Sequence, residues 1–144
     1  MEYLKQIVDY GIIGILILLS IISVAIAIER IGYYRKVDVL KFSNVKELET
    51  DLTRGLHIIA TIGANAPYIG LLGTVLGIML TFYTIGQEGL VDSKKVMVGL
   101  ALALKATAMG LLVAIPSIFI YNFLLRKVKE KITFWEIENG RKRV

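Results

Sequence analysis

The chain has 144 residues, of which 56% are hydrophobic, and its 17 lysines and arginines outnumber its 12 aspartates and glutamates. This composition is typical of an integral membrane protein and leaves little chain for a separate soluble domain. The chain has no cysteine for a disulfide and no Gly-Lys-Ser/Thr sequence for a phosphate loop. Its one histidine is His57, so we expect neither a His/Cys metal site nor a Ser-His-Asp triad within one chain, and therefore a protein that is not an enzyme and has no cofactor.

Three apolar segments are long enough to cross a bilayer, which takes about 20 residues. They are residues 11–28, 58–85 and 96–125, and Lys105 is the one charged residue within them. The sequence therefore predicts an all-α integral membrane fold that forms one membrane domain over residues 1–144. The second and third segments exceed the minimum length, so we expect them to tilt or to extend beyond the bilayer as helices.

The distribution of lysine and arginine predicts the orientation, because cytoplasmic loops carry an excess of both. The stretches 29–57 and 126–144 hold thirteen of them, whereas the N-terminal tail and the loop between the second and third spans hold Lys5, Lys94 and Lys95. We therefore expect the N-terminus outside, the C-terminus inside and the two basic stretches in the cytoplasm. The same rule, with attraction to anionic lipid, accounts for the net charge of +5 and gives no ground for nucleic-acid binding.

Both cytoplasmic stretches have helical patterns. Asn44 and Glu47 have the spacing of a capping box, and apolar residues follow at helical intervals. We expect a helix that begins at about Val45 and continues into the second span. The tail from 123 to 137 mixes apolar and charged residues, and it is either a helical continuation of the third span, with Trp135 packed against a neighbour, or a solvated basic tail.

Small residues recur along the second and third spans. In the second span Gly63, Gly70 and Gly77 are seven residues apart, and Gly73 forms a GxxxG pair with Gly77. In the third span the small residues at intervals of three and four are Gly99, Ala103, Ala106, Gly110, Ala114 and Ser117. Such faces let helix backbones approach closely within and between the subunits of a homo-oligomer. The residues expected to pack helices are Gly70, Gly73, Gly77 and Gly110, together with Pro116, which should bend the third helix.

Two threonines are candidates for a pore. A threonine in a membrane helix usually bonds the carbonyl four residues earlier, and this accounts for most of the polar side chains in the spans. Thr74 and Thr107 differ because each lies within the small-residue region of its span. If these faces line a pore, the two hydroxyls can hold water or bond a partner's carboxylate.

Lys105 lies near the middle of the third span, where an isolated ammonium costs at least about 2.5–3.5 kcal/mol. The three predicted spans contain no acidic residue, so we expect a carboxylate partner to come from another protein. The alternative is a lysine that extends to the membrane surface and has no function. Thr107 is about 200° around the helix from Lys105, at about 100° per residue, so the two cannot both point into one pore.

Two stretches resemble motifs of the ExbB/TolQ/MotA proton-channel family. The second-span motif is matched by residues 66–79, which read APYIGLLGTVLGIM. The third-span motif is matched by residues 106–116, which read ATAMGLLVAIP, together with Tyr121 and Asn122. The short length and the presence of Lys105 are most similar to the small ExbB-type members. The larger members carry a glutamate at the position of Leu102 and a longer cytoplasmic insertion.

The resemblance implies a proton-driven motor in the bacterial inner membrane. In this family a ring of subunits, a homopentamer, surrounds the single transmembrane helices of two ExbD-like subunits, and protons pass between ring and helices through an aspartate on the ExbD-like helix. The work is delivered to a TonB-like transducer, which opens outer-membrane receptors for import. Thr74 and Thr107 match the family's pore-facing threonines, and Lys105 would pair with the aspartate of the ExbD-like helix.

Three other functions compete with this one. A TolQ-like subunit of the Tol-Pal envelope-maintenance system is the nearest alternative, and the sequence does not separate it from the ExbB-type role. A small solute carrier would show an inverted repeat or a pair of broken helices, and the sequence shows neither. A passive scaffold would not need an ion such as Lys105 in the membrane.

Overall fold

The computed structural model describes residues 2–89 and 91–143, and the elements among them are helical. They are α1 (Glu2–Lys36), the 3-10 helix η1 (Val39–Lys41), α2 (Val45–Leu52), α3 (Leu56–Glu88) and α4 (Ser93–Arg143). Within these described residues, three segments are long and apolar enough to cross a membrane: Tyr3–Lys36, Leu56–Glu88 and Ser93–Lys142. The prediction of an all-helical protein with three long apolar helices is therefore confirmed, and each helix is longer than the segment expected to span the bilayer.

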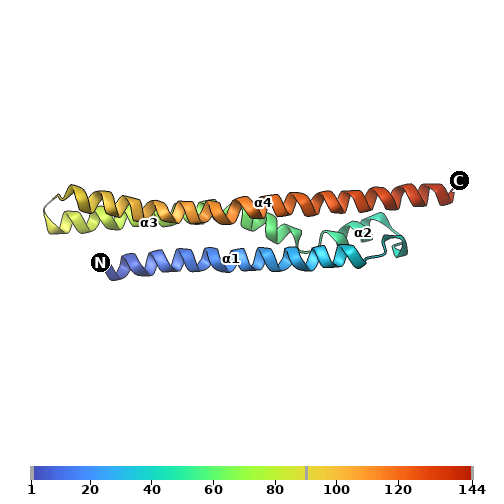
Figure 1. Cartoon of the computed structure of the whole chain (residues 1–144), viewed down its shortest axis with the longest axis horizontal. Helices are drawn as coiled ribbons and strands as arrows, with labels where there is room; N and C mark the ends of the chain where they lie inside the picture. The colour runs from blue at the N-terminus through green and yellow to red at the C-terminus, as the bar shows by residue number, and fades with distance from the viewer. Residues whose placement is uncertain (1, 90, 144) are drawn as a thin grey trace.

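The long helices lie side by side in a narrow bundle (Figure 1). α3 and α4 form an antiparallel pair, and α1 runs along that pair. α1 begins short of the end of the bundle at which α3 ends and α4 begins. At the opposite end α4 projects furthest, and α2 lies beside it and beside the end of α1.

One face of α1 is buried against the other helices. Its buried residues are Ile12, Leu16, Ser23, Ala27, Arg30 and Tyr34. They are separated by three, four or seven residues, which keeps them on one side of an α-helix. The other faces carry large exposed apolar side chains such as Leu18 and Ile21. α1 therefore meets helices on one side and is suited to meet lipid on the others.

α3 and α4 approach each other most closely at Gly70 and Gly110. A Cβ built on Gly70 would lie 2.6 Å from the carbonyl oxygen of Ala106 and 3.1 Å from the Cα of Gly110. A Cβ built on Gly110 would lie 2.6 Å from the carbonyl oxygen of Ala66 and 3.1 Å from the Cα of Gly70. The two backbones are thus in direct contact, and only glycine fits at either position without displacing a helix.

The helix predicted to run from Val45 into the second span is broken. Asn44 caps α2, because its Oδ1 accepts a hydrogen bond from the Lys46 backbone N–H at 2.8 Å. α2 ends at Leu52, and α3 starts again after Gly55, whose φ of 84° is a left-handed conformation that glycine adopts without strain. The expectation of one continuous helix is therefore wrong, and the chain turns at residues 53–55.

Arg30 of α1 fixes this turn in place. Its Nη1 donates to the carbonyl oxygens of Asp51 at 2.8 Å and Leu52 at 3.5 Å at the end of α2, where the last carbonyls of a helix lack partners four residues on. The hydroxyl of Tyr34 donates to the Leu52 carbonyl as well. Arg30 is 3% exposed, and its Nε donates to Glu29 at 2.6 Å. A guanidinium at the negative end of a helix dipole is also favourable, so α1 both binds and caps α2.

The apolar core at this end joins all the helices. Leu48, Leu52, Leu56 and Ile59 are buried against Leu124 and Val128 of α4. Trp135 is also buried, and its Nε1 donates to the carbonyl oxygen of Phe42 at 2.9 Å. Of the two alternatives for the tail, the structure has the packed helix, with Trp135 inside the cluster and Phe134 exposed.

The contact between Gly70 and Gly110 should tolerate no added methyl group. Gly70→Ala places a Cβ 2.6 Å from a backbone oxygen, so α3 and α4 must separate, at a cost of about 1–3 kcal/mol. We expect a lower midpoint of thermal unfolding in detergent. Gly86→Ala is the matched control, because Gly86 is in the same helix with no atom within 4 Å of its Cβ position. Equal midpoints for the two variants would contradict the close contact.

Candidate functional site

Thr74 and Thr107 meet between α3 and α4. Thr74 is 6% exposed, and its Oγ1 lies 2.9 Å from the carbonyl oxygen of Ala103 on the opposite helix and 3.3 Å from that of Gly70 on its own. The hydroxyls of Thr74 and Thr107 also form a hydrogen bond. A hydroxyl has one hydrogen, so when Thr74 donates to Ala103 it accepts from Thr107. The oxygen of the half-buried Thr107 then keeps a lone pair for a further donor.

The contact between the threonines follows from the position of the glycines. Thr74 is one turn from Gly70, and Thr107 is one turn from Gly110. With the backbones in contact at these glycines, the next turn brings the two hydroxyls together. Thr61, Thr81 and Thr84 instead donate to the carbonyls four residues earlier on α3. This is the local bond expected of a threonine in a membrane helix.

Lys105 pairs with an acidic residue of the same chain. Its Nζ lies 3.3 Å from Oδ2 of Asp9 on α1, and the side chains are 47% and 35% exposed. The expectation that a carboxylate must come from another protein is therefore wrong. The expectation is wrong because the first span was predicted to begin at Gly11. α1 begins at Glu2, so Asp9 belongs to the same helix and lies one turn before Ile12, on the side of α1 that faces the other helices.

Lys105 and Thr107 contact different helices. Lys105 reaches α1 through Asp9, whereas Thr107 bonds Thr74 on α3. This is the geometry expected of two side chains two residues apart on an α-helix. α4 thus carries an ion pair on the side of α1 and a pair of hydroxyls on the side of α3.

The remaining small residues extend the contact between α3 and α4. A Cβ on Gly73 would lie 2.8 Å from the Cβ of Ala106 and 3.0 Å from Cγ2 of Ile12 on α1. A Cβ on Gly77 would lie 3.0 Å from the Cβ of Ala103. The two small-residue stripes therefore face each other within one subunit. Pro116 lies on an exposed part of α4, and the helix continues through it.

A pair of serines links α1 to α4 at the centre of the bundle. Ser23 and Ser117 are 2% and 3% exposed, and their Oγ atoms are 3.1 Å apart. The sequence patterns did not predict this contact. The available signal was that Ser23 lies on the same helical stripe as Leu16 and Ala27 and is therefore buried. Within the described residues, no group of three or more His, Asp and Glu side chains could hold a metal ion.

The fold is that of a multi-pass membrane protein, because it has three apolar helices long enough to cross a membrane. Two of these helices, α3 and α4, are joined along small residues, and polar side chains such as Thr74 and Thr107 lie between them. The model of the MotA/TolQ/ExbB proton channel family matches residues 38–137. The chain belongs to this family, and the resemblance seen in the two motifs is confirmed.

Named relatives match the chain over nearly its whole length. It is 56% identical to the biopolymer transport protein ExbB of Aquifex aeolicus, over 97% of this chain and 95% of the relative. It is 56% identical to a putative biopolymer transport protein, ExbB-like 2, of Helicobacter pylori, over 93% of this chain and 89% of the relative. Its identity to the Helicobacter pylori ExbB is 50%, over 88% of each.

The pairing of Asp9 with Lys105 can be measured by a double-mutant cycle. We expect Asp9→Asn and Lys105→Met to be non-additive in unfolding free energy, by up to about 1 kcal/mol because both side chains are partly exposed. Unfolding in mixed micelles, followed by circular dichroism, gives the four values. Asp9→Asn with Lys129→Met is the control pair and should be additive. Additivity in both cycles would show that the Asp9–Lys105 pair does not form.

Proposed function

We propose that the chain is the channel subunit of a proton-driven motor in the bacterial inner membrane. With an ExbD-like single-span partner, it would couple the proton-motive force to a TonB-like transducer and so to import through outer-membrane receptors. Family membership and the ExbB name of relatives aligned over most of their length support this role. The same names favour it over the TolQ-like alternative.

The observation that carries the proposal is the hydroxyl chain from Thr107 through Thr74 to the Ala103 carbonyl. Because each donor in this chain already has an acceptor, the free lone pair of Thr107 is suited to accept a hydrogen bond from a protonated carboxyl group or from water. A carboxyl group on a partner helix would therefore find an acceptor while protonated. When ionised it would lose that bond, since an ionised carboxylate only accepts.

Within this proposal the other site residues have different roles. Gly70, Gly73, Gly77 and Gly110 hold α3 against α4, and so keep the two hydroxyls in contact. Lys105, held by Asp9, is the polar group on the α1 side of the proton pathway rather than a pore-lining residue.

A homopentameric ring is part of the proposal. The small-residue stripes are already used within one subunit, so contacts between subunits need other faces. The exposed apolar side chains of α3 and α4, such as Leu72, Met79, Leu112 and Phe119, provide them. In a bilayer these surfaces meet either lipid or a neighbouring subunit, and a neighbour whose helices fit closely against them would form the ring.

Removing the two central hydroxyls should uncouple the motor without dismantling it. Valine keeps the shape of threonine and removes its hydroxyl, so Thr74→Val/Thr107→Val should lower TonB-dependent uptake in cells in which it replaces the wild-type chain. The oligomer should still assemble. Thr61→Val is the matched control, because Thr61 bonds only its own helix and is exposed. Wild-type uptake by the double variant would refute the proposed site.

The ring itself is tested by mass. We expect native mass spectrometry of the full chain, extracted in mild detergent with its lipid retained, to give a homo-oligomer of five subunits. Leu72→Lys places a charge on an exposed apolar face and should shift the distribution to smaller species, since a buried lysine without a partner is costly. A monomer from the wild-type chain under these conditions would rule out a ring.

A further inference from the structure

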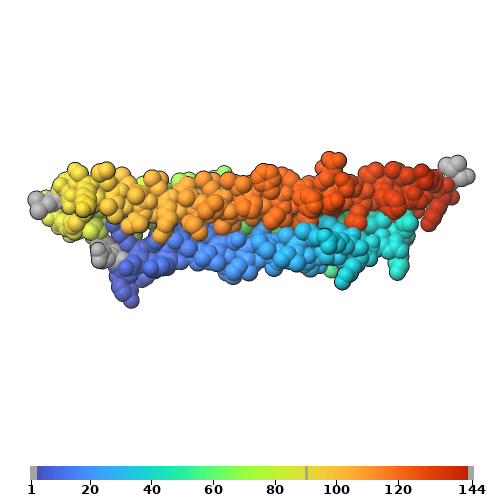
Figure 2. Space-filling view, in the orientation of Figure 1, coloured from blue at the N-terminus to red at the C-terminus, as the bar shows by residue number. Residues whose placement is uncertain are grey.

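A cavity of about 540 Å³ opens between the start of α1 and the neighbouring ends of α3 and α4. Figure 2 shows the hollow between the beginning of α1, in blue, and the yellow to orange part of the α3–α4 pair. One water molecule needs about 10–15 Å³ of such space, so the cavity has room for many waters. It lies at the end of the bundle that the lysine and arginine distribution places outside.

The cavity exists because its floor is made of the smallest residues. Gly73, Gly77, Ala103 and Ala106 line it, and none has a side chain long enough to fill the space between α1 and the helix pair. α1 also begins short of the end of the bundle at which α3 and α4 are connected, which leaves the cavity open on that side (Figure 1). The small residues that let α3 and α4 approach each other thus leave a hollow on the face toward α1.

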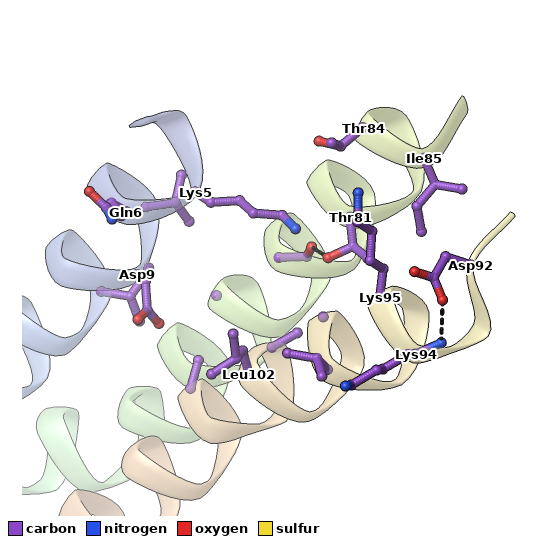
Figure 3. Close-up of a pocket in the computed structure, with 18 of the residues that line it drawn as sticks. Lys5, Gln6, Asp9, Thr81, Thr84, Ile85, Asp92, Lys94, Lys95 and Leu102 are labelled. Atoms are coloured by element: carbon purple, nitrogen blue, oxygen red, sulfur yellow. Dashed lines mark hydrogen bonds between the residues drawn. The ribbon is translucent and has the colours of Figure 1, made fainter. Parts of the chain in front are cut away.

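The walls of the cavity carry charged and polar groups. Lys5 and Asp9 lie one turn apart on α1, and both project into it, with Lys5 extending toward Thr81 on α3 (Figure 3). On the opposite side Glu88 and Lys95 form an ion pair of 3.0 Å at the rim. A lipid chain offers these groups no hydrogen bond, whereas water would add to the contacts that they already make.

The inner end of the cavity lies close to the threonine pair. Ala103 lines the cavity, and its carbonyl oxygen accepts a hydrogen bond from the hydroxyl of Thr74. Ala106 lines it too and precedes Thr107 in the chain. The cavity therefore reaches the turn of α4 that carries the hydroxyl chain. Asp9 is held at this level by Lys105 at 3.3 Å.

We propose that this cavity is a water-filled vestibule through which protons from outside reach the layer of the threonine pair. This rests on the proposed function for the role of the protons, but the presence of water does not depend on it. Asp9 is the positioning residue, because its ion pair with Lys105 keeps a charged, hydrated group at the inner end and fixes α1 against α4 there.

Cysteine labelling tests the vestibule directly, because the natural chain has no cysteine. Leu102 lines the cavity and Leu104 does not, yet both are 57% exposed in the isolated chain. Each is replaced by cysteine in the full chain, which is then placed in lipid nanodiscs. A cationic methanethiosulfonate that does not cross membranes is added to both faces. The thiolate attacks its sulfur, forms a mixed disulfide and releases methanesulfinate.

We expect Leu102→Cys to react at least about tenfold faster than Leu104→Cys, which is the effect of one unit in thiol pKa between wet and apolar surroundings. Equal, slow reaction would overturn the proposal, because lipid or a neighbouring subunit would then fill the cavity. A second measurement tests the proton route: labelled Leu102→Cys should lose TonB-dependent uptake, and labelled Leu104→Cys should keep it. Fast labelling with unchanged uptake would also overturn the proposal, since the water would lie off the proton route. The wild-type chain in the uptake assay tests the proposed function alone.

Discussion

The contact of Gly70 with Gly110 determines most of the architecture. In a bilayer, apolar side chains gain little by leaving lipid for one another, so helices associate through close packing and polar contacts. Here each glycine faces a backbone carbonyl of the opposite helix at a distance that excludes a Cβ. The position of α3 along α4 is set by this contact. The meeting of Thr74 with Thr107 and of Gly77 with Ala103 follows from the same register.

α1 is attached to this pair by a different kind of interaction. It makes polar contacts at three levels: Asp9 with Lys105, Ser23 with Ser117, and Arg30 with the carbonyls that end α2. Between them Ile12, Leu16 and Ala27 fill the interface. The glycine contact thus sets the register of α3 and α4, whereas the polar contacts set the register of α1, because a hydrogen bond fails when its partners slide by a turn.

The sequence predicts the contacts that follow from the regular spacing of residues along a helix. It does not predict those that depend on the residue at which a helix begins or ends. Regular spacing identifies the glycines of the helix contact, and the position of Thr74 and Thr107 among small residues singles out this pair. Asp9 lies outside the predicted spans because hydropathy places the start of the first span at Gly11, although α1 begins at Glu2. The turn at Gly55 was missed because Leu48, Leu52, Leu56 and Ile59 keep helical spacing across it, and all four are buried. Periodicity reports which residues are buried, and it does not report where the backbone changes direction.

α4 connects the two kinds of interaction. It is continuous over 51 residues, about 77 Å at 1.5 Å per residue, and it bonds α3 at Thr107, α1 at Lys105 and Phe42 at Trp135. The described part of α4 contains no turn that could absorb a rotation, whereas α2 and α3 are separated by one. A displacement of α4 at the threonine pair must therefore appear at the end of α4 that carries Trp135 as well. The ion pair at Asp9 and the indole bond at Trp135 are the two places where such a displacement would be felt, one on each side of the threonine pair.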